Sequence, residues 1–168
     1  IPAQVDKINI TMGYPAQNTS VAALVSMLAE LKRYEKQNDG STYYYYKPVI
    51  ALLNHKLIKN TAPEAISALV NEINAKNIVY IPKELLALNV ISRAVFSSGE
   101  ENLAAYLLNV LRQLITALRP ESKNYLRIEK EFLFSIYTTV QSIHNTFVEE
   151  HIAPDNKLYL QIIGKILQ

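Results

Sequence analysis

The chain has 168 residues, a length that suits one domain, and 49% of them are hydrophobic, which is ample for a sizeable core. A net charge of +2 is too small to indicate a dedicated nucleic-acid module by electrostatics alone. The lack of cysteine excludes a disulfide scaffold, a thiolate metal site and a cysteine nucleophile. No apolar run approaches the length of a membrane span, and residues 1–4 do not resemble a secretion signal. We therefore expect a globular cytoplasmic protein with no membrane partner.

The first patterned segment is a predicted strand at residues 5–11, where Ile8 and Ile10 would face a core and Gly13 would end the strand. Little in the later sequence offers a second strand. A lone strand leaves backbone N–H and C=O groups without partners, which a complete domain rarely tolerates. We therefore expect a piece of a longer protein, in which residues 1–16 are an extended remnant of another domain and residues 17–168 form a single helical domain.

Helical periodicity accounts for most of the following sequence. A first helix is predicted at about residues 20–36, capped by Asn18, Thr19 or Ser20. A polar loop at 38–41 follows. Further helices are predicted at about 48–57 and 63–75, the second opened by a capping box at 61–64, and one or two short helices at about 85–96. The apolar run at 78–81 is either an extended connector or a brief strand.

The second half of the sequence predicts longer helices. A capping box at 98–101 opens a helix that reaches Leu118, with an apolar face wide enough to pack on several neighbours. Pro120 breaks it, and the longest helix follows at about 121–150, so that the two form an antiparallel hairpin. Asp155 is positioned to cap a last helix at 156–168. The predicted fold class is all-α, an irregular bundle of about six to eight helices with a long C-terminal antiparallel pair and one short N-terminal extended strand.

The sequence contains no set of residues that predicts catalysis. Its four glycines are isolated, so no phosphate-binding loop is present. His144 and His151 are spaced two helical turns apart, too far for one metal ion. Glu121 and Asp155 belong to segments that match the two halves of a PD-(D/E)xK nuclease motif, but in reversed order and at predicted helix starts, where acidic residues complement the helix dipole. We therefore predict no catalytic, cofactor-binding or metal-binding residue in this chain.

Two features suggest contact with DNA. Bases could stack on the tyrosine run at 43–46, although the same run is explained if two of its four side chains pack inward. Basic residues on either side of the run could contact phosphates, although a solvated helix face explains them too and is the favoured alternative. The candidate DNA-contacting residues are Lys32, Arg33, Lys36, Tyr44, Tyr45 and Lys47.

Two segments resemble the AddB/RecC-like helicase-nuclease family. Residues 8–21 read INITMGYPAQNTSV and resemble the family pattern N-(I/V)-T-M-G-Y-P-L followed by T-P-V. Residues 44–55 read YYYKPVIALLNH and resemble Y-Y-K-D-V-L-A-L-L-N-H. The resemblance is close over residues 8–58, and beyond residue 58 only the general residue pattern is similar. The chain departs from the family at Ala16, Ser20 and Pro48. The chain most resembles the single-chain form from Bacteroidetes-like bacteria, a PD-(D/E)xK nuclease family protein.

This resemblance implies that the strand belongs to a RecA-like helicase domain and that the helices form an insertion in it. The chain would then be a non-catalytic helical scaffold and DNA-contacting insertion of a bacterial helicase-nuclease acting in double-strand-break repair and recombination. The resemblance implies that the parent protein is an ATP-dependent helicase and PD-(D/E)xK exonuclease that uses ATP and Mg²⁺. DNA and a helicase subunit are the expected partners. We expect no cofactor and no small-molecule ligand in the chain itself.

The alternative is an autonomous helical protein-interaction module with no nucleic-acid role, whose exposed apolar surface binds a partner helix. An intact small enzyme is disfavoured because the sequence lacks catalytic motifs.

Overall fold

The computed structural model describes residues 19–99, 102–118, 124–152 and 155–166. The strand predicted at 5–11, the extended segment at 1–16, the break at Pro120 and the nuclease-like Glu121 lie outside these residues. The division into residues 1–16 and 17–168 therefore stays a prediction.

Helices make up most of the described chain, as the periodicity predicts. They are α1 (Ser20–Arg33), α2 (Tyr46–Asn54), α3 (Lys56–Lys59), α4 (Pro63–Ala75), α5 (Val90–Val95), α6 (Leu103–Ala117), α7 (Asn124–Glu149) and α8 (Asn156–Ile166), with a 3-10 turn at Lys83–Leu86. The helix predicted at 48–57 is divided in two at His55, which caps α3 with its side chain.

A small antiparallel sheet corrects the all-α prediction. Its strands are β1 (Glu35–Asn38), β2 (Ser41–Tyr45) and β3 (Tyr80–Pro82), in the order β1-β2-β3. The end of the helix predicted at 20–36 and the beginning of the tyrosine run are therefore strands. The run at 78–81 contributes to a brief strand, and its partner within the described chain is β2. The fold is mostly helical but not purely α.

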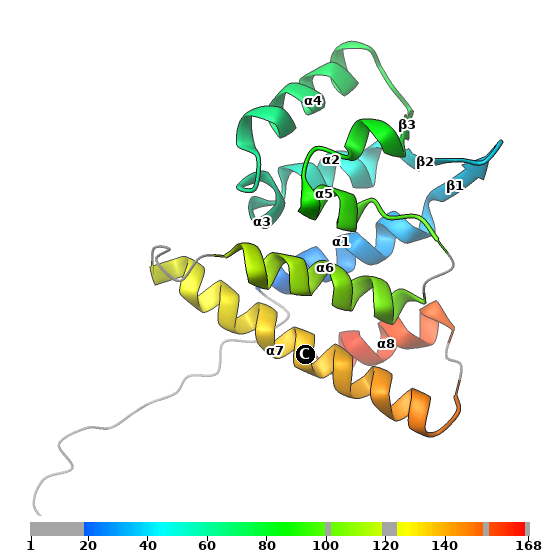
Figure 1. The fold of residues 1–168 in the computed structure, drawn as a ribbon, viewed down its shortest axis with the longest axis vertical. Coiled ribbons are helices and arrows are strands. Elements are labelled where there is room, and N and C mark those ends of the chain that lie inside the picture. Colours follow the sequence, from blue (N-terminus) through cyan, green and yellow to red (C-terminus); the bar gives the residue numbers. More distant parts are fainter. Residues whose placement is uncertain (1–18, 100–101, 119–123, 153–154, 167–168) are drawn as a thin grey trace, which may run out of the picture.

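Helix α6 lies at the centre of the molecule, as its wide apolar face predicts. It contacts α1, α5, α7 and α8 (Figure 1). Leu107, Val110 and Leu111 are fully buried on it, and Tyr106 donates a hydrogen bond from its hydroxyl to the Val95 carbonyl at 2.7 Å. One contiguous apolar cluster includes buried side chains from α1 through α8, so the helices above and below α6 share a core.

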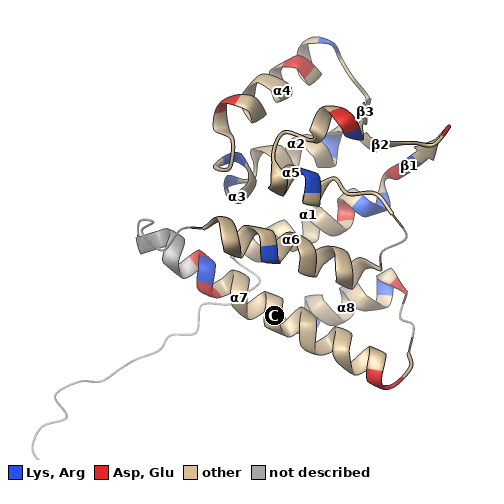
Figure 2. Ribbon diagram, in the orientation of Figure 1, with Lys and Arg blue, Asp and Glu red and all other residues tan. Residues whose placement is uncertain are grey.

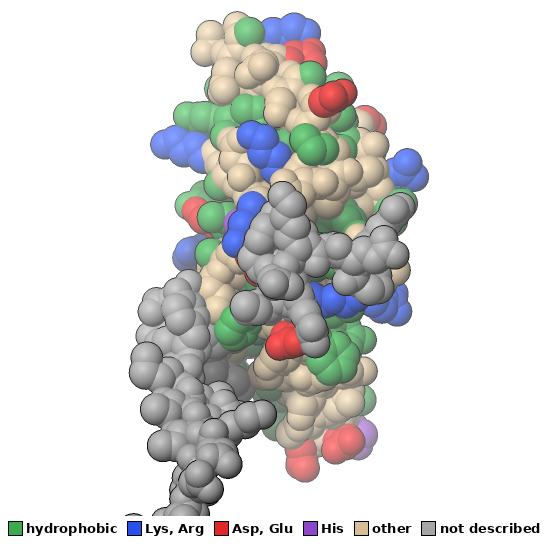
Figure 3. Space-filling view, turned by 90° about the vertical axis from the view of Figure 1, so that its left-hand side faces the viewer, with side chains coloured by type: hydrophobic (Ala, Val, Ile, Leu, Met, Phe, Trp, Pro, Cys, Tyr) green, Lys and Arg blue, Asp and Glu red, His purple; other side chains and the backbone are tan. Residues whose placement is uncertain are grey.

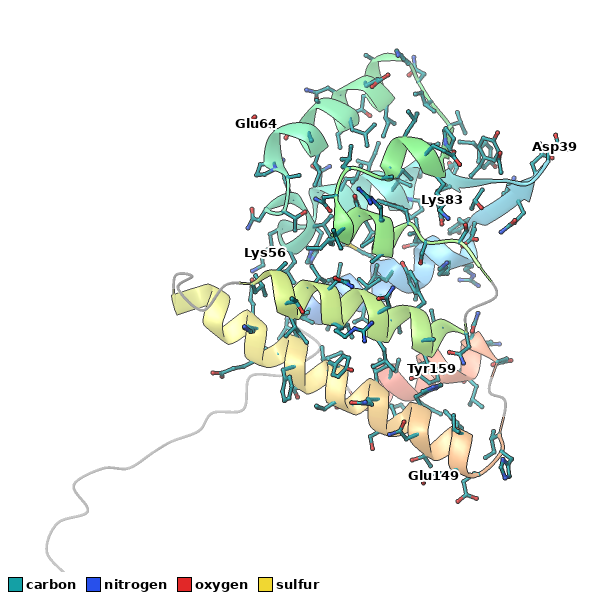
Figure 4. The ribbon with its side chains drawn as sticks, in the orientation of Figure 1. Asp39, Lys56, Glu64, Lys83, Glu149 and Tyr159 are labelled. Carbon is teal, nitrogen blue, oxygen red and sulfur yellow. The ribbon has the colours of Figure 1, made fainter. Side chains whose placement is uncertain are left out.

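The two long helices α6 and α7 run antiparallel side by side, which confirms the predicted hairpin of helices (Figure 1). Helix α8 packs back onto this pair. The Tyr159 hydroxyl donates to the Val140 carbonyl of α7 at 3.0 Å, and the Tyr159 side chain lies between α7 and α8 in Figure 4. Asp155 accepts a hydrogen bond from the Leu158 N–H at 2.6 Å, which confirms it as the cap of α8.

Neither of the two predicted capping boxes caps its helix. Helix α4 begins after Ala62, because the Thr61 hydroxyl turns back to donate to the Ile58 carbonyl at 2.7 Å. Helix α6 begins after Asn102, whose side chain accepts from the Ala105 N–H at 2.8 Å. Thr19, one of the three candidates predicted to cap α1, does so and accepts from the Ala22 N–H at 3.1 Å.

Candidate functional site

The small sheet exists because of a tight turn at Asp39 and Gly40. These residues have φ angles of 49° and 75°, the left-handed conformation that a two-residue hairpin turn of type I′ requires. Asn38 then pairs with Ser41, and Glu35 pairs with Tyr44. Thr and Tyr are residues that favour strands, so the sequence after the turn suits β2.

The inner face of the sheet is part of the core. Tyr44 is 0% exposed, its ring meets Phe96 at a centroid distance of 5.6 Å, and its hydroxyl donates to the Phe96 carbonyl at 3.0 Å. Burial raises the pKa of the Tyr44 hydroxyl, and the nearby Glu35 carboxylate raises it further. Because the Tyr44 side chain is fully buried, it offers no exposed ring on which a base could stack.

Lys32 is also drawn inward. Its ammonium group forms an ion pair with Glu35 at 3.0 Å, donates to the Ser97 carbonyl and lies 4.5 Å from the centre of the Tyr106 ring. The side chain is 16% exposed. Lys32 therefore ties the end of α1 to the segment between α5 and α6, and Glu35 offsets its charge.

The outer face of the sheet gathers tyrosines. Tyr45 pairs directly with Tyr80 across β2 and β3, and side chains of directly paired residues lie on the same face. The Tyr45 ring is 5.9 Å from that of Tyr80 and 6.0 Å from that of Tyr34, which follows the last turn of α1. Tyr34 and Tyr80 are 44% and 41% exposed.

Lys36 adds a positive charge to this face. Its ammonium group lies 4.4 Å from the centre of the Tyr80 ring and donates to the Tyr80 hydroxyl at 2.7 Å. In β1 it pairs with Tyr43, so Tyr43 is on the same face. We call the surface formed by Tyr34, Lys36, Tyr43, Tyr45 and Tyr80 the tyrosine face. It occupies the outer side of the sheet, and the sheet itself lies at the upper right in Figure 1.

The remaining predicted DNA-contacting residues lie near this surface in the chain. Arg33 is exposed at the end of α1, directly before Tyr34. Lys47 is exposed in the first turn of α2, directly after Tyr46, whose ring packs edge-on against Tyr45 at 4.9 Å. The structure therefore joins Lys36 and Tyr45 in one surface, places Arg33 and Lys47 beside it in the chain, and removes Lys32 and Tyr44 from it.

Sequence reasoning missed Tyr34 and Tyr80 as members of this surface. Tyr34 fits the apolar period of α1 and was expected to be part of that helix, whereas the helix ends at Arg33. Tyr80 belongs to an apolar run with no evident partner. The Asp39-Gly40 pair was the available signal, because this dipeptide favours a two-residue hairpin turn and strand-forming Thr and Tyr residues follow it.

A second polar cluster joins α7 to α1 and α3. Glu129 is buried on α7, accepts from the Ser20 hydroxyl at 3.1 Å and forms an ion pair with Lys56, which Figure 4 places near the beginning of α7. Helical periodicity did not predict that Glu129 is buried. Its contacts hold three helices together, and we assign it a structural role.

The rest of the described surface offers no metal centre. Among the described residues, no group of three His, Asp or Glu side chains is placed to hold a metal ion. Red and purple side chains at the bottom of Figure 3 lie at the end of α7, where Figure 4 labels Glu149. On the side away from the sheet, Lys and Arg side chains are spread among hydrophobic and neutral ones (Figure 3).

In the part of the chain that the structure describes, no helix combines the length and the apolar character needed to cross a membrane. Comparisons of the chain with protein-family models, with curated proteins and with solved structures find no match.

Proposed function

We propose that this chain binds single-stranded DNA through the tyrosine face, as a non-catalytic helical scaffold within a bacterial helicase-nuclease of double-strand-break repair. The observation that supports DNA contact is the arrangement of Tyr34, Tyr45 and Tyr80 around one exposed area of sheet with Lys36 beside them. The parentage is supported by the resemblance of residues 8–58 to AddB/RecC-like proteins.

Stacking gives this surface its affinity. Every base has a π-face, so stacking on an aromatic ring tolerates sequence, and each stacked base contributes about 1–3 kcal/mol. Tyr34 and Tyr80 are the exposed rings of the face, and Tyr45 between them packs against both. Lys36 and Lys47 are the candidates for phosphate contact near the face.

In this proposal the chain guides a strand and does no chemistry. ATP hydrolysis and Mg²⁺-dependent cutting belong to other parts of the parent protein, and a helicase subunit is a further partner. The compartment is the cytoplasm, where such a protein meets its DNA.

The test is binding of a fluorescent single-stranded oligonucleotide to the chain, measured by anisotropy over a range of salt concentrations. We expect affinity to fall as salt increases, because phosphate contacts release counterions. Tyr80→Leu should weaken binding at every salt concentration by about tenfold, the loss of one stacked base. Tyr80→Phe keeps the ring and should bind nearly as well as the unchanged chain.

Two control variants separate stacking from general damage. Phe134→Ala removes an exposed aromatic ring from α7, remote from the sheet in Figure 1, and should leave binding unchanged. Tyr44→Phe removes a buried hydroxyl and should lower stability without changing affinity. No detectable binding even at low salt, or equal binding by Tyr80→Leu, would contradict the proposal.

A second candidate function, binding of a partner helix, is favoured by apolar side chains on α7. Phe134 and Val148 are both exposed and are spaced so that they lie on the same side of the helix. Association through such a surface would depend little on salt. An interaction that persists at high salt and is lost in Phe134→Ser would support this alternative.

A further inference from the structure

A groove lies next to the tyrosine face, between the end of α1 and the beginnings of α6 and α8. It is an open groove of about 770 Å³, and its lining combines the apolar Ala29 and Leu103 with polar and charged side chains that include Glu30, Arg33, Asn156, Lys157 and Gln161. We call it the α1–α8 groove. In Figure 1 its three helix ends lie at the right of the molecule, below the sheet.

The free charges of the groove are mainly positive. Arg33 and Lys157 are exposed, and neither forms an ion pair with a described carboxylate. Lys32 also lines the groove, but Glu35 offsets its charge. Glu30 is the acidic residue of the lining, so two uncompensated cations face one carboxylate. Figure 2 shows basic segments at the end of α1 and at the beginning of α8, with an acidic segment beside each.

Arg33 connects the groove to the tyrosine face along the chain. Arg33 lines the groove and precedes Tyr34, whose ring packs on Tyr45 at 6.0 Å. A ligand that leaves the stacked tyrosines along α1 therefore meets Arg33 next and then Lys157 across the groove. Arg and Lys side chains that have no internal partner suit the phosphates of a nucleic-acid strand.

We propose that the α1–α8 groove holds the sugar-phosphate backbone of the same single strand whose bases stack on the tyrosine face. The inference rests on the proposed function and adds a second contact region to it, with Arg33 and Lys157 as phosphate-binding residues in addition to Lys36 and Lys47 near the face. Stacking on the tyrosine face contributes affinity for the strand at all salt concentrations. Phosphate contacts in the groove account for much of the salt dependence of that affinity.

The experiment measures the slope of log affinity against log salt concentration for the full chain and a single-stranded DNA oligonucleotide. For the double variant Arg33→Gln/Lys157→Gln, loss of two phosphate contacts should make the slope shallower by about 1.4. The matched control is Arg93→Gln/Lys165→Gln, which removes an exposed arginine of α5 and an exposed lysine of α8 outside the groove lining. The control slope should not change.

The Tyr80→Leu variant distinguishes failure of the groove from failure of the face. Tyr80→Leu should reduce affinity about equally at all salt concentrations and keep the slope of the unchanged chain. If the double groove variant retains that slope while Tyr80→Leu weakens binding, the groove proposal is wrong and the face stands. If only the groove variant changes binding, the face proposal is wrong. If the unchanged chain does not bind DNA at low salt, both are wrong.

Discussion

His55 joins two parts of the fold through its two ring nitrogens. Its Nδ1 accepts from the Leu57 N–H at 3.3 Å and so caps α3, while Nε2 lies 2.9 Å from the Ser20 carbonyl at the beginning of α1. An imidazole that accepts at Nδ1 must carry its proton on Nε2, so the folded protein holds the neutral form. Burial lowers the pKa of His55 below 6.5; the Ser20 hydrogen bond opposes this effect and the nearby Lys56 adds to it.

This arrangement predicts that acid weakens the fold. Because the folded protein binds the His55 proton less readily than the unfolded chain, the contribution of His55 to stability is complete above the unfolded pKa of 6.5. It is lost progressively as pH falls below that value. Urea unfolding between about pH 5 and pH 8 should therefore show falling midpoints on the acid side.

Two substitutions check the assignment to His55. The Asn side chain keeps an acceptor for the Leu57 N–H but does not titrate. His55→Asn should therefore reduce the fall of the urea midpoint at acid pH. His151→Asn changes an exposed histidine beyond the end of α7 and should retain it. Equal acid dependence in His55→Asn and the unchanged chain would contradict the assignment.

The tyrosine run shows why single residues of the candidate site were hard to assign from sequence. Strand burial is read from alternation of polar and apolar residues, and a run of identical side chains has none. The alternation became visible only with the strand register, which places Tyr44 opposite Glu35 on the inner face and Tyr45 opposite Tyr80 on the outer face. Lys32 was equally ambiguous, because its partners Glu35 and Ser97 meet only in the folded chain.

At the scale of elements, the hairpin of β1 and β2 depends on Gly40. A Cβ atom at Gly40 would meet no atom within 4 Å, so a substitution there is limited by its φ angle of +75° and not by space. Gly40→Ala should destabilise the hairpin by about 1–2 kcal/mol, the cost of the left-handed conformation for a residue with a Cβ. Hydrogen exchange of the β1 and β2 amides measures this loss.

Asn tolerates the left-handed conformation, so Gly40→Asn is the matched control and should retain most of the protection of these amides. Because the hairpin carries Lys36 and Tyr45, Gly40→Ala should also weaken DNA binding more than Gly40→Asn does. Equal protection in the two variants would show that the turn does not require this conformation.

Helices were predicted more successfully than the sheet for a physical reason. The periods of α4, α6 and α7 arise from local sequence, and their bounds agree with the predicted ones to within a few residues. The sheet depends on pairing between β2 and β3, which are separated by α2, α3 and α4 along the chain. The caps of α4 and α6 were misplaced because hydroxyl side chains of Thr61 and Ser98 bond elsewhere, to the Ile58 carbonyl and Lys83.

At the scale of the whole molecule, one apolar cluster connects the helices on both sides of α6. A single shared core predicts one cooperative unfolding transition. The chain has eleven tyrosines and no tryptophan, so tyrosine emission reports on side-chain packing while far-UV circular dichroism reports on helix content. We expect both signals to give the same urea midpoint.

Two separate midpoints would show that one part of the fold unfolds independently of the rest. A shared midpoint would support the prediction that residues 17–168 form a single domain. Tyr159→Phe provides a further check, because loss of its bond to the Val140 carbonyl should lower the common midpoint and not create a second transition.

The two edges of the sheet determine how a ligand can approach it. Within the described chain, β1 and β3 are the edge strands. Strand β1 carries the polar sequence Glu-Lys-Gln-Asn, and β3 is three residues long and ends in Pro82. Charged, short or proline-containing edges discourage the addition of another strand. A peptide is therefore poorly placed to extend this sheet through its backbone, and recognition is left to the side chains that stand on its outer surface.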